Sequence, residues 1–179
     1  MSASLILCGC TGLKHGDAVR QPLDAKLQIR NNAASLLYDL LGNEKNVSKI
    51  LIVKRNSEEL GILIKTISET AATAHKQMEA LAANDANLDL HSTGLPAGEK
   101  AARAAAAKTK EHELLSTSGK EFELNLLLTQ AEALGYASEL ATIAAGNSRS
   151  PEEIRQFALI NRDMKNLHAQ VLKQIKQKT

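Results

Sequence analysis

The chain has 179 residues, of which 44% are hydrophobic and only 2% aromatic, and its 22 basic and 20 acidic residues give a formal net charge of +2. This length predicts one domain with a self-sufficient core, and a composition rich in Ala and Leu favours packed helices. The interspersed charges argue against a nucleic-acid-binding surface, and no apolar run approaches the roughly 18 residues that a membrane-spanning helix needs.

The chain begins with a short apolar stretch and a polar segment. The run LCGC at residues 7–10 resembles a bacterial lipobox. We therefore predict that Cys10 is lipidated and that residues 1–23 are a lipoprotein signal remnant followed by a flexible tether. No Lys or Arg precedes Cys10, so we expect the true start to lie upstream or to have been trimmed. Two alternatives stay open, an N-terminus that merely contains CGC and a cysteine metal site with His15 nearby.

Beyond residue 23 the sequence predicts helices, because all three prolines fall between periodic segments. A first helix is expected over 24–54, with a wobble at Gly42 that divides it into two pieces. Asn56 and Glu59 have the spacing of a capping box at the start of the second helix. The stripe of this second helix has helical spacing and comprises Leu60, Ile64, Ile67, Ala71, Ala74, Met78 and Leu81.

The second half of the chain contains further helices. A crossing loop precedes an Ala-rich helix over 97–116. A long helix over 119–145 carries apolar residues over a wide arc, which is typical of a central, well-covered helix. Ser150, Pro151 and Glu153 stand at the N-cap, first-turn and capping-box positions of a last helix that runs to the C-terminus.

These long amphipathic segments, with a longer connection in the middle, suit a ferritin-like four-helix bundle. In that arrangement two hairpins are joined by a crossover, and the additional Ala-rich helix lies in the crossover. The expected fold class is therefore all-α, with residues 24–179 forming a single helical-bundle domain.

A series of stretches carries a resemblance to known proteins: AASLLYDLLGNEKNVSKILIVKRNSEEL, AHKQMEALA, LLSTSGKEFELNLLLTQAEA, SPEEIRQFA and LHAQ. In this order they are similar to a family of small ferritin-like bacterial envelope proteins of unknown function. The likeness covers about residues 33–172 and is strongest in the SGKEFE turn and in the register of the first two helices. The resemblance implies a ferritin-like bundle in the bacterial envelope.

The resemblance also implies that the metal ligands have largely been lost. A ferritin-like centre commonly uses Glu-x-x-His on each of two helices, and no Glu-x-x-His occurs in this chain. Where the family usually carries an Asp-His pair, the chain has Thr70 with Ala71 and Ala133 with Leu134. The resemblance therefore implies a degenerate member, for which we predict no metal and no cofactor.

Three residual candidates for a metal ligand remain, Glu44, His168 and His75. Glu44 and His168 lie on core stripes of the first and last long helices, which are neighbours in most ferritin-like arrangements. Because a buried carboxylate without a partner is unfavourable, we expect Glu44 to pair with His168, with Asn161 as a second partner. His75 has Glu79 one turn further on, a spacing more typical of a boundary hydrogen bond than of a ligand set.

No phosphate-binding glycine loop, nucleophile elbow or Cys-His catalytic arrangement occurs in the sequence. We therefore predict no catalytic residue and no enzymatic activity.

The expected function is that of a non-enzymatic lipoprotein in the periplasm, anchored to the membrane by its lipid alone, which binds an unidentified envelope protein or has a structural role. The alternative is a residual single-metal or redox-linked binding protein of ferritin-like ancestry. A membrane-surface role for the basic last helix is a third interpretation, although the core requires its apolar face.

Overall fold

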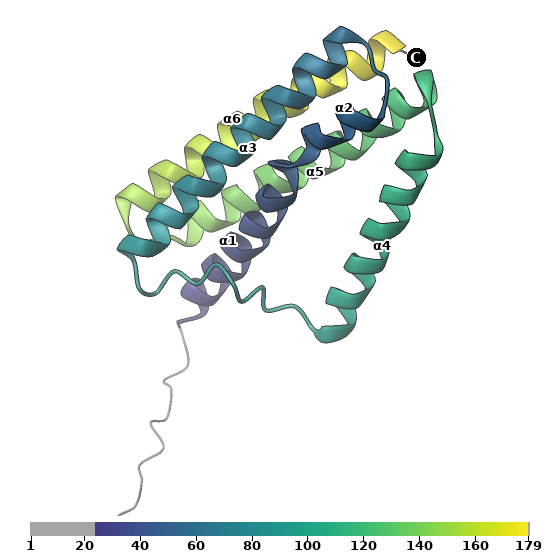
Figure 1. Cartoon of the computed structure of the whole chain (residues 1–179). Helices are drawn as coiled ribbons and strands as arrows, with labels where there is room; N and C mark the ends of the chain where they lie inside the picture. Colours follow the sequence, from purple (N-terminus) through teal and green to yellow (C-terminus); the bar gives the residue numbers. More distant parts are fainter. Residues whose placement is uncertain (1–23, 179) are drawn as a thin grey trace, which may run out of the picture.

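The computed structural model describes residues 24–178, which form helices joined by turns and one long loop (Figure 1). The described part contains no strand, so the all-α prediction is confirmed. None of its helices is long and apolar enough to cross a membrane. In chain order the elements are α1 (Ala25–Glu44), a 3-10 turn (Val47–Lys49), α2 (Ile50–Val53), α3 (Glu58–Asn84), α4 (Ala97–Ser116), α5 (Gly119–Asn147) and α6 (Pro151–Lys178).

Four long helices, α1, α3, α5 and α6, pack around one apolar core. The helix α5 packs against both α6 and α1, and α3 packs against both α1 and α6. The helices α1 and α6 therefore lie at opposite corners of the bundle (Figure 1). We expected these two helices to be neighbours, and that prediction was wrong. The chain forms the hairpins α1/α3 and α5/α6, joins them through α4, and packs α5 rather than α6 beside α1, so the first and last helices lie on a diagonal.

The local sequence predicts most of the helix boundaries. The first helix ends at Glu44 and resumes after the 3-10 turn, which confirms the break expected near Gly42. The bounds of α4 coincide with the predicted segment. The predicted stripe of α3 is buried throughout, as is most of the wide apolar arc of α5. These features are local because they depend on capping residues, prolines and helical periodicity.

At both predicted capping boxes a carboxylate joins the N-terminal end of the helix to a distant helix. Ser57, not Asn56, is the N-cap of α3. The backbone N–H and the hydroxyl of Ser57 both donate to the Glu123 carboxylate of α5. At the start of α6, the Glu153 carboxylate accepts hydrogen bonds from Arg30 of α1. The predicted role of Asn56 was therefore wrong, because a tertiary carboxylate satisfies the helix N-terminus.

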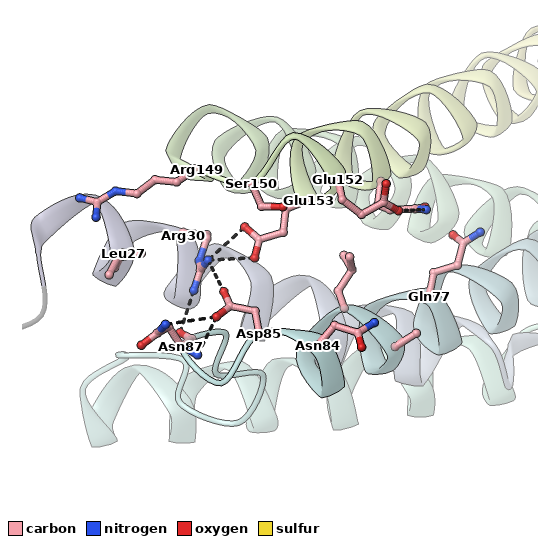
Figure 2. Close-up of a pocket in the computed structure, with 13 residues that line it drawn as sticks. Leu27, Arg30, Gln77, Asn84, Asp85, Asn87, Arg149, Ser150, Glu152 and Glu153 are labelled. Atoms are coloured by element: carbon pink, nitrogen blue, oxygen red, sulfur yellow. Dashed lines mark hydrogen bonds and ion pairs between the residues drawn. The ribbon is translucent and has the colours of Figure 1, made fainter.

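A buried guanidinium ties together one end of the bundle (Figure 2). Arg30 is only 2% exposed, and its Nη1 lies 3.0 Å from both oxygens of Glu153, which is 3% exposed. The same Nη1 donates to Asp85 at 2.8 Å, and Nη2 donates to the carbonyl oxygen of Asn87 at 2.7 Å. Nε donates to Asn31 at 3.1 Å. The Arg30 network thus joins α1 to α6 and to the end of α3.

The two carboxylates of the Arg30 network have different proton affinities. Burial raises the pKa of Glu153, and the attraction of Arg30 opposes that rise. Burial of Asp85 has the same effect, but hydrogen bonds from the Asn87 backbone and from Arg30 outweigh it and hold the pKa of Asp85 at about 2. Both carboxylates are near Arg30, so removal of this cation affects the more deeply buried Glu153 most.

Substituting Arg30→Met should lower the free energy of unfolding by about 3 to 5 kcal/mol at pH 8, because Glu153 is left buried without its cation. The loss should shrink as the pH falls towards 5, since protonation removes the uncompensated charge. Urea unfolding followed by circular dichroism measures both effects. Arg155→Met, which removes an exposed ion pair with Glu152, should cost less than about 1 kcal/mol. Equal losses of unfolding free energy in Arg30→Met and Arg155→Met would contradict the role of Arg30 in compensating the buried charge of Glu153.

Candidate functional site

A groove of about 870 Å³ lies between α1 and α2 on one side and α4 and α5 on the other. Small-molecule sites are commonly about 300 to 1,000 Å³ and mainly apolar. Apolar side chains form much of the wall, and they include Leu40, Val47, Ile50, Val53, Leu114, Leu115, Leu126 and Tyr136. We call this cavity the α4 groove.

The sequence of α4 explains why the groove stays open. Figure 1 shows α4 standing apart from the four-helix core along most of its length. Leu114 is its one buried residue, because the run AARAAAAKTK lacks an apolar stripe of large side chains. Alanine buries little apolar area, so this helix gains little from close packing against the bundle. It therefore forms a wall of the groove without filling it.

Polar contacts hold α4 in place. Lys54, just after α2, donates from Nζ to the carbonyl oxygens of Leu115 and Thr117 at 2.6 and 2.7 Å. These bonds fix the C-terminal end of α4. Farther along α4, Lys110 pairs with Glu132 of α5. Arg103 Nη1 lies 3.2 Å from the hydroxyl of Tyr136, also on α5. These contacts attach α4 to α5 and to the segment after α2, and Lys110, Glu132 and Tyr136 are themselves part of the groove lining.

Glu44 and Gln130 bring unpaired acceptors to the groove. Glu44 is half-buried near the end of α1, and Gln130 of α5 is only 2% exposed. Their side chains are hydrogen-bonded to each other. Glu44 Oε2 and Gln130 Oε1 are nevertheless buried and have no hydrogen-bond partner among the described residues. Burial raises the pKa of Glu44 to about 7, against the opposing effect of the Gln130 hydrogen bond.

The predicted pairing of Glu44 with His168 does not occur. Glu44 meets Gln130 on one side of α5, whereas the His168 ring of α6 approaches another part of that helix at Gly135. Asn161 does not join Glu44 either, since its amide donates to the Ser138 carbonyl and to the Thr142 hydroxyl, both at 2.6 Å. The expectation was wrong because α5 lies between α1 and α6.

His75 lies apart from both of these residues. Its ring is buried and stacks on Tyr38 with 4.0 Å between the ring centroids. His75 Nδ1 lies 3.3 Å from Glu79 Oε1, which confirms the expected boundary contact. Burial lowers the pKa of His75, and nearby Lys45 lowers it further. Within residues 24–178, no group of three or more His, Cys, Asp or Glu side chains could hold a metal ion.

A second cavity, of about 520 Å³, lies at the Arg30 end of the bundle (Figure 2). Amide side chains such as Gln77, Asn84 and Gln156 line it together with the Arg30 network. Glu153 and Asp85 already neutralise its buried guanidinium. An anionic ligand would therefore have to compete with two carboxylates, so we consider the α4 groove the stronger binding site.

Two central residues of these sites, Arg30 and Gln130, were missed by the sequence analysis. Each is a polar residue on an otherwise apolar helical stripe, Arg30 before Ala34 and Gln130 between Leu126 and Leu134. That signal indicates a buried polar group. It does not identify the partner, which comes from a distant segment in both cases. The lipidation prediction at Cys10 lies outside the described residues.

Comparisons of the chain with known protein families, curated proteins and solved structures yield no match. The chemistry of the α4 groove itself therefore indicates what it can bind. It combines an apolar wall, a volume suited to a small molecule and unpaired buried acceptors. Such a combination is typical of a binding site, in which a few polar groups orient a mainly apolar ligand.

Titration of Glu44 should make stability depend on pH. Its folded pKa of about 7 exceeds the ordinary value of 4.5, so the folded state holds a proton that the unfolded chain has released. The free energy of unfolding should therefore fall between pH 5 and 8, by on the order of 2 to 3 kcal/mol. The variant Glu44→Gln should lack this pH dependence. Urea unfolding should show that its free energy of unfolding nearly equals that of the unmodified protein at pH 5 and exceeds it at pH 8.

His75 contributes in the opposite direction, because its lowered pKa makes stability rise with pH. His75 is present in both the unmodified protein and Glu44→Gln. The difference between their curves of unfolding free energy against pH therefore reports Glu44 alone. Parallel curves from pH 5 to 8 would contradict the titration of Glu44.

Proposed function

We propose that the protein is a non-enzymatic binding module that takes a small, largely apolar ligand into the α4 groove. One observation carries the proposal: α4 borders a groove of about 870 Å³ and buries only Leu114 of its own residues. A groove of this volume suits a drug-sized molecule. The apolar wall supplies the driving force, because contact with a ligand removes its surface from water.

The proposal retains the cellular setting that the sequence favours. The protein is held at the periplasmic side of the bacterial envelope by lipid on Cys10, with the following polar residues as a tether. LCGC at residues 7–10 supports this setting. The stretches similar to small ferritin-like envelope proteins support ferritin-like ancestry, as does a four-helix core with a helix in its crossover.

The alternative occupant of the α4 groove is an envelope protein. A standard protein interface buries about 800 Å² on each partner, whereas the volume of the α4 groove suits a smaller molecule. The metal-binding alternative has less support, because Glu44, His75 and His168 do not form a common cluster. We therefore favour the small ligand as the occupant.

Binding should be blocked by a large side chain placed in the groove. Ala133 of α5 lines the groove, so Ala133→Trp should weaken binding of the uncharged dye N-phenyl-1-naphthylamine by about tenfold or more. The fluorescence increase of the dye on transfer to an apolar site measures its affinity. Circular dichroism melting verifies that the variant is folded.

Ala105→Trp is the matched control. Ala105 is exposed on α4 and does not line the groove, so this variant should bind the dye like the unmodified protein. Failure of the unmodified protein to bind the dye, or equal weakening by both substitutions, would refute the groove as the binding site.

A further inference from the structure

We infer that the α4 groove selects an amphiphilic primary amine, whose ammonium group contacts Glu44 and Gln130 and whose apolar body lies along the groove wall. This inference rests on the proposed function and specifies the ligand class. Two buried oxygens, Glu44 Oε2 and Gln130 Oε1, have no hydrogen-bond partner among residues 24–178.

The unpaired atoms require a hydrogen-bond donor. An ionised Glu44 only accepts hydrogen bonds, and Gln130 Oε1 is also an acceptor. An ammonium group carries three N–H donors, so one group has enough donors for both oxygens. A hydroxyl offers only one. Both an ammonium and a hydroxyl would make a charge-assisted hydrogen bond to the ionised carboxylate, but only the ammonium adds the attraction of opposite charges, which favours an amine over an alcohol.

The charges around the groove also favour a cation. Its charged lining residues are Glu44, Lys110, Glu111 and Glu132. One lysine against three ionised glutamates gives this lining a net charge of −2. Lys110 already pairs with Glu132, so it is not free to receive an anionic head group. A ligand carboxylate would therefore experience repulsion.

Glu44 can reach a ligand through a small movement. Its side chain lines the groove and is half-buried, although Oε2 itself is covered. The terminal torsion of glutamate has a broad, roughly two-fold energy profile. Rotation about that bond moves both carboxylate oxygens without a change in the backbone, and it would bring one of them towards the groove. The contact with the amine then compensates for the desolvation of the carboxylate.

The apolar wall determines the rest of the ligand. Leu40, Ile50 and Leu126 lie in the same groove as Glu44. A small ammonium ion would leave this wall in contact with water, and a polyamine would place further charges against it. A single amino group on a hydrocarbon or aromatic body satisfies both parts of the site.

Binding of the amine requires ionised Glu44. Burial raises the pKa of this carboxyl to about 7, whereas an alkylamine stays protonated to about pH 10. Affinity for the amine should therefore rise from pH 5.5 to 8 and then level off. The other carboxyls of the lining, Glu111 and Glu132, are exposed on α4 and α5, and Lys110 faces Glu132. Glu44 is thus the lining group that gives the pH dependence near neutrality.

The test compares decylamine, decanol and decanoate, which share one apolar chain. At pH 8 each compound displaces N-phenyl-1-naphthylamine from the full chain, at concentrations below its micellar range. Decylamine should bind about tenfold more tightly than decanol, and decanoate should bind most weakly. Glu44→Gln should remove the preference for the amine and leave the affinity for decanol within about twofold.

Glu113→Gln is the matched control, because Glu113 is exposed on α4 and does not line the groove. It should preserve the amine preference. Equal affinities for decylamine and decanol, or a preference that survives Glu44→Gln, would overturn the amine inference while leaving the groove as an apolar binding site. Failure of all three compounds and of the dye to bind would overturn the proposed function itself.

Discussion

The buried Arg30 network is the constraint on which the arrangement of the bundle depends. A guanidinium that is 2% exposed is tolerated only where charged and polar partners surround it. Its partners come from the start of α6, the end of α3 and the loop that follows. These segments are distant in the sequence, so the network fixes the register of α1 against both hairpins. It also fixes the point at which the chain leaves the bundle.

The path of α4 follows from that exit point. The loop after Asn87 remains close to α1, because Ser35 donates to the Leu90 carbonyl at 3.0 Å and both Leu88 and Leu90 are buried. The 20 residues of α4 then span about 30 Å back towards the opposite end. Lys54 holds the end of α4 near α2. Two fixed ends and an alanine-rich surface between them leave the α4 groove open.

The groove combines features that packing alone does not favour. Glu44 Oε2 and Gln130 Oε1 are buried without a hydrogen-bond partner in the described part of the chain, which lowers stability. Local departures from ideal packing and hydrogen bonding are typical of binding sites, where the ligand supplies the missing contacts. The Glu44 carboxyl, whose burial lowers stability, would complement the charge of the proposed amine. Its protonation would then link stability to binding of that amine.

The sequence alone determined the helices, the break after Glu44, the bounds of α4 and the apolar stripe of α3. Those features depend on neighbouring residues, through prolines, caps and helical periodicity. The tertiary structure decided which stripes face one another, because several antiparallel arrangements of the same amphipathic helices satisfy the same periodicity. It placed α1 and α6 on a diagonal, gave Glu44 to Gln130 instead of His168, and moved the cap contact of α3 to Glu123. Each of these contacts joins residues far apart in the chain, so their geometry exists only once the bundle has assembled.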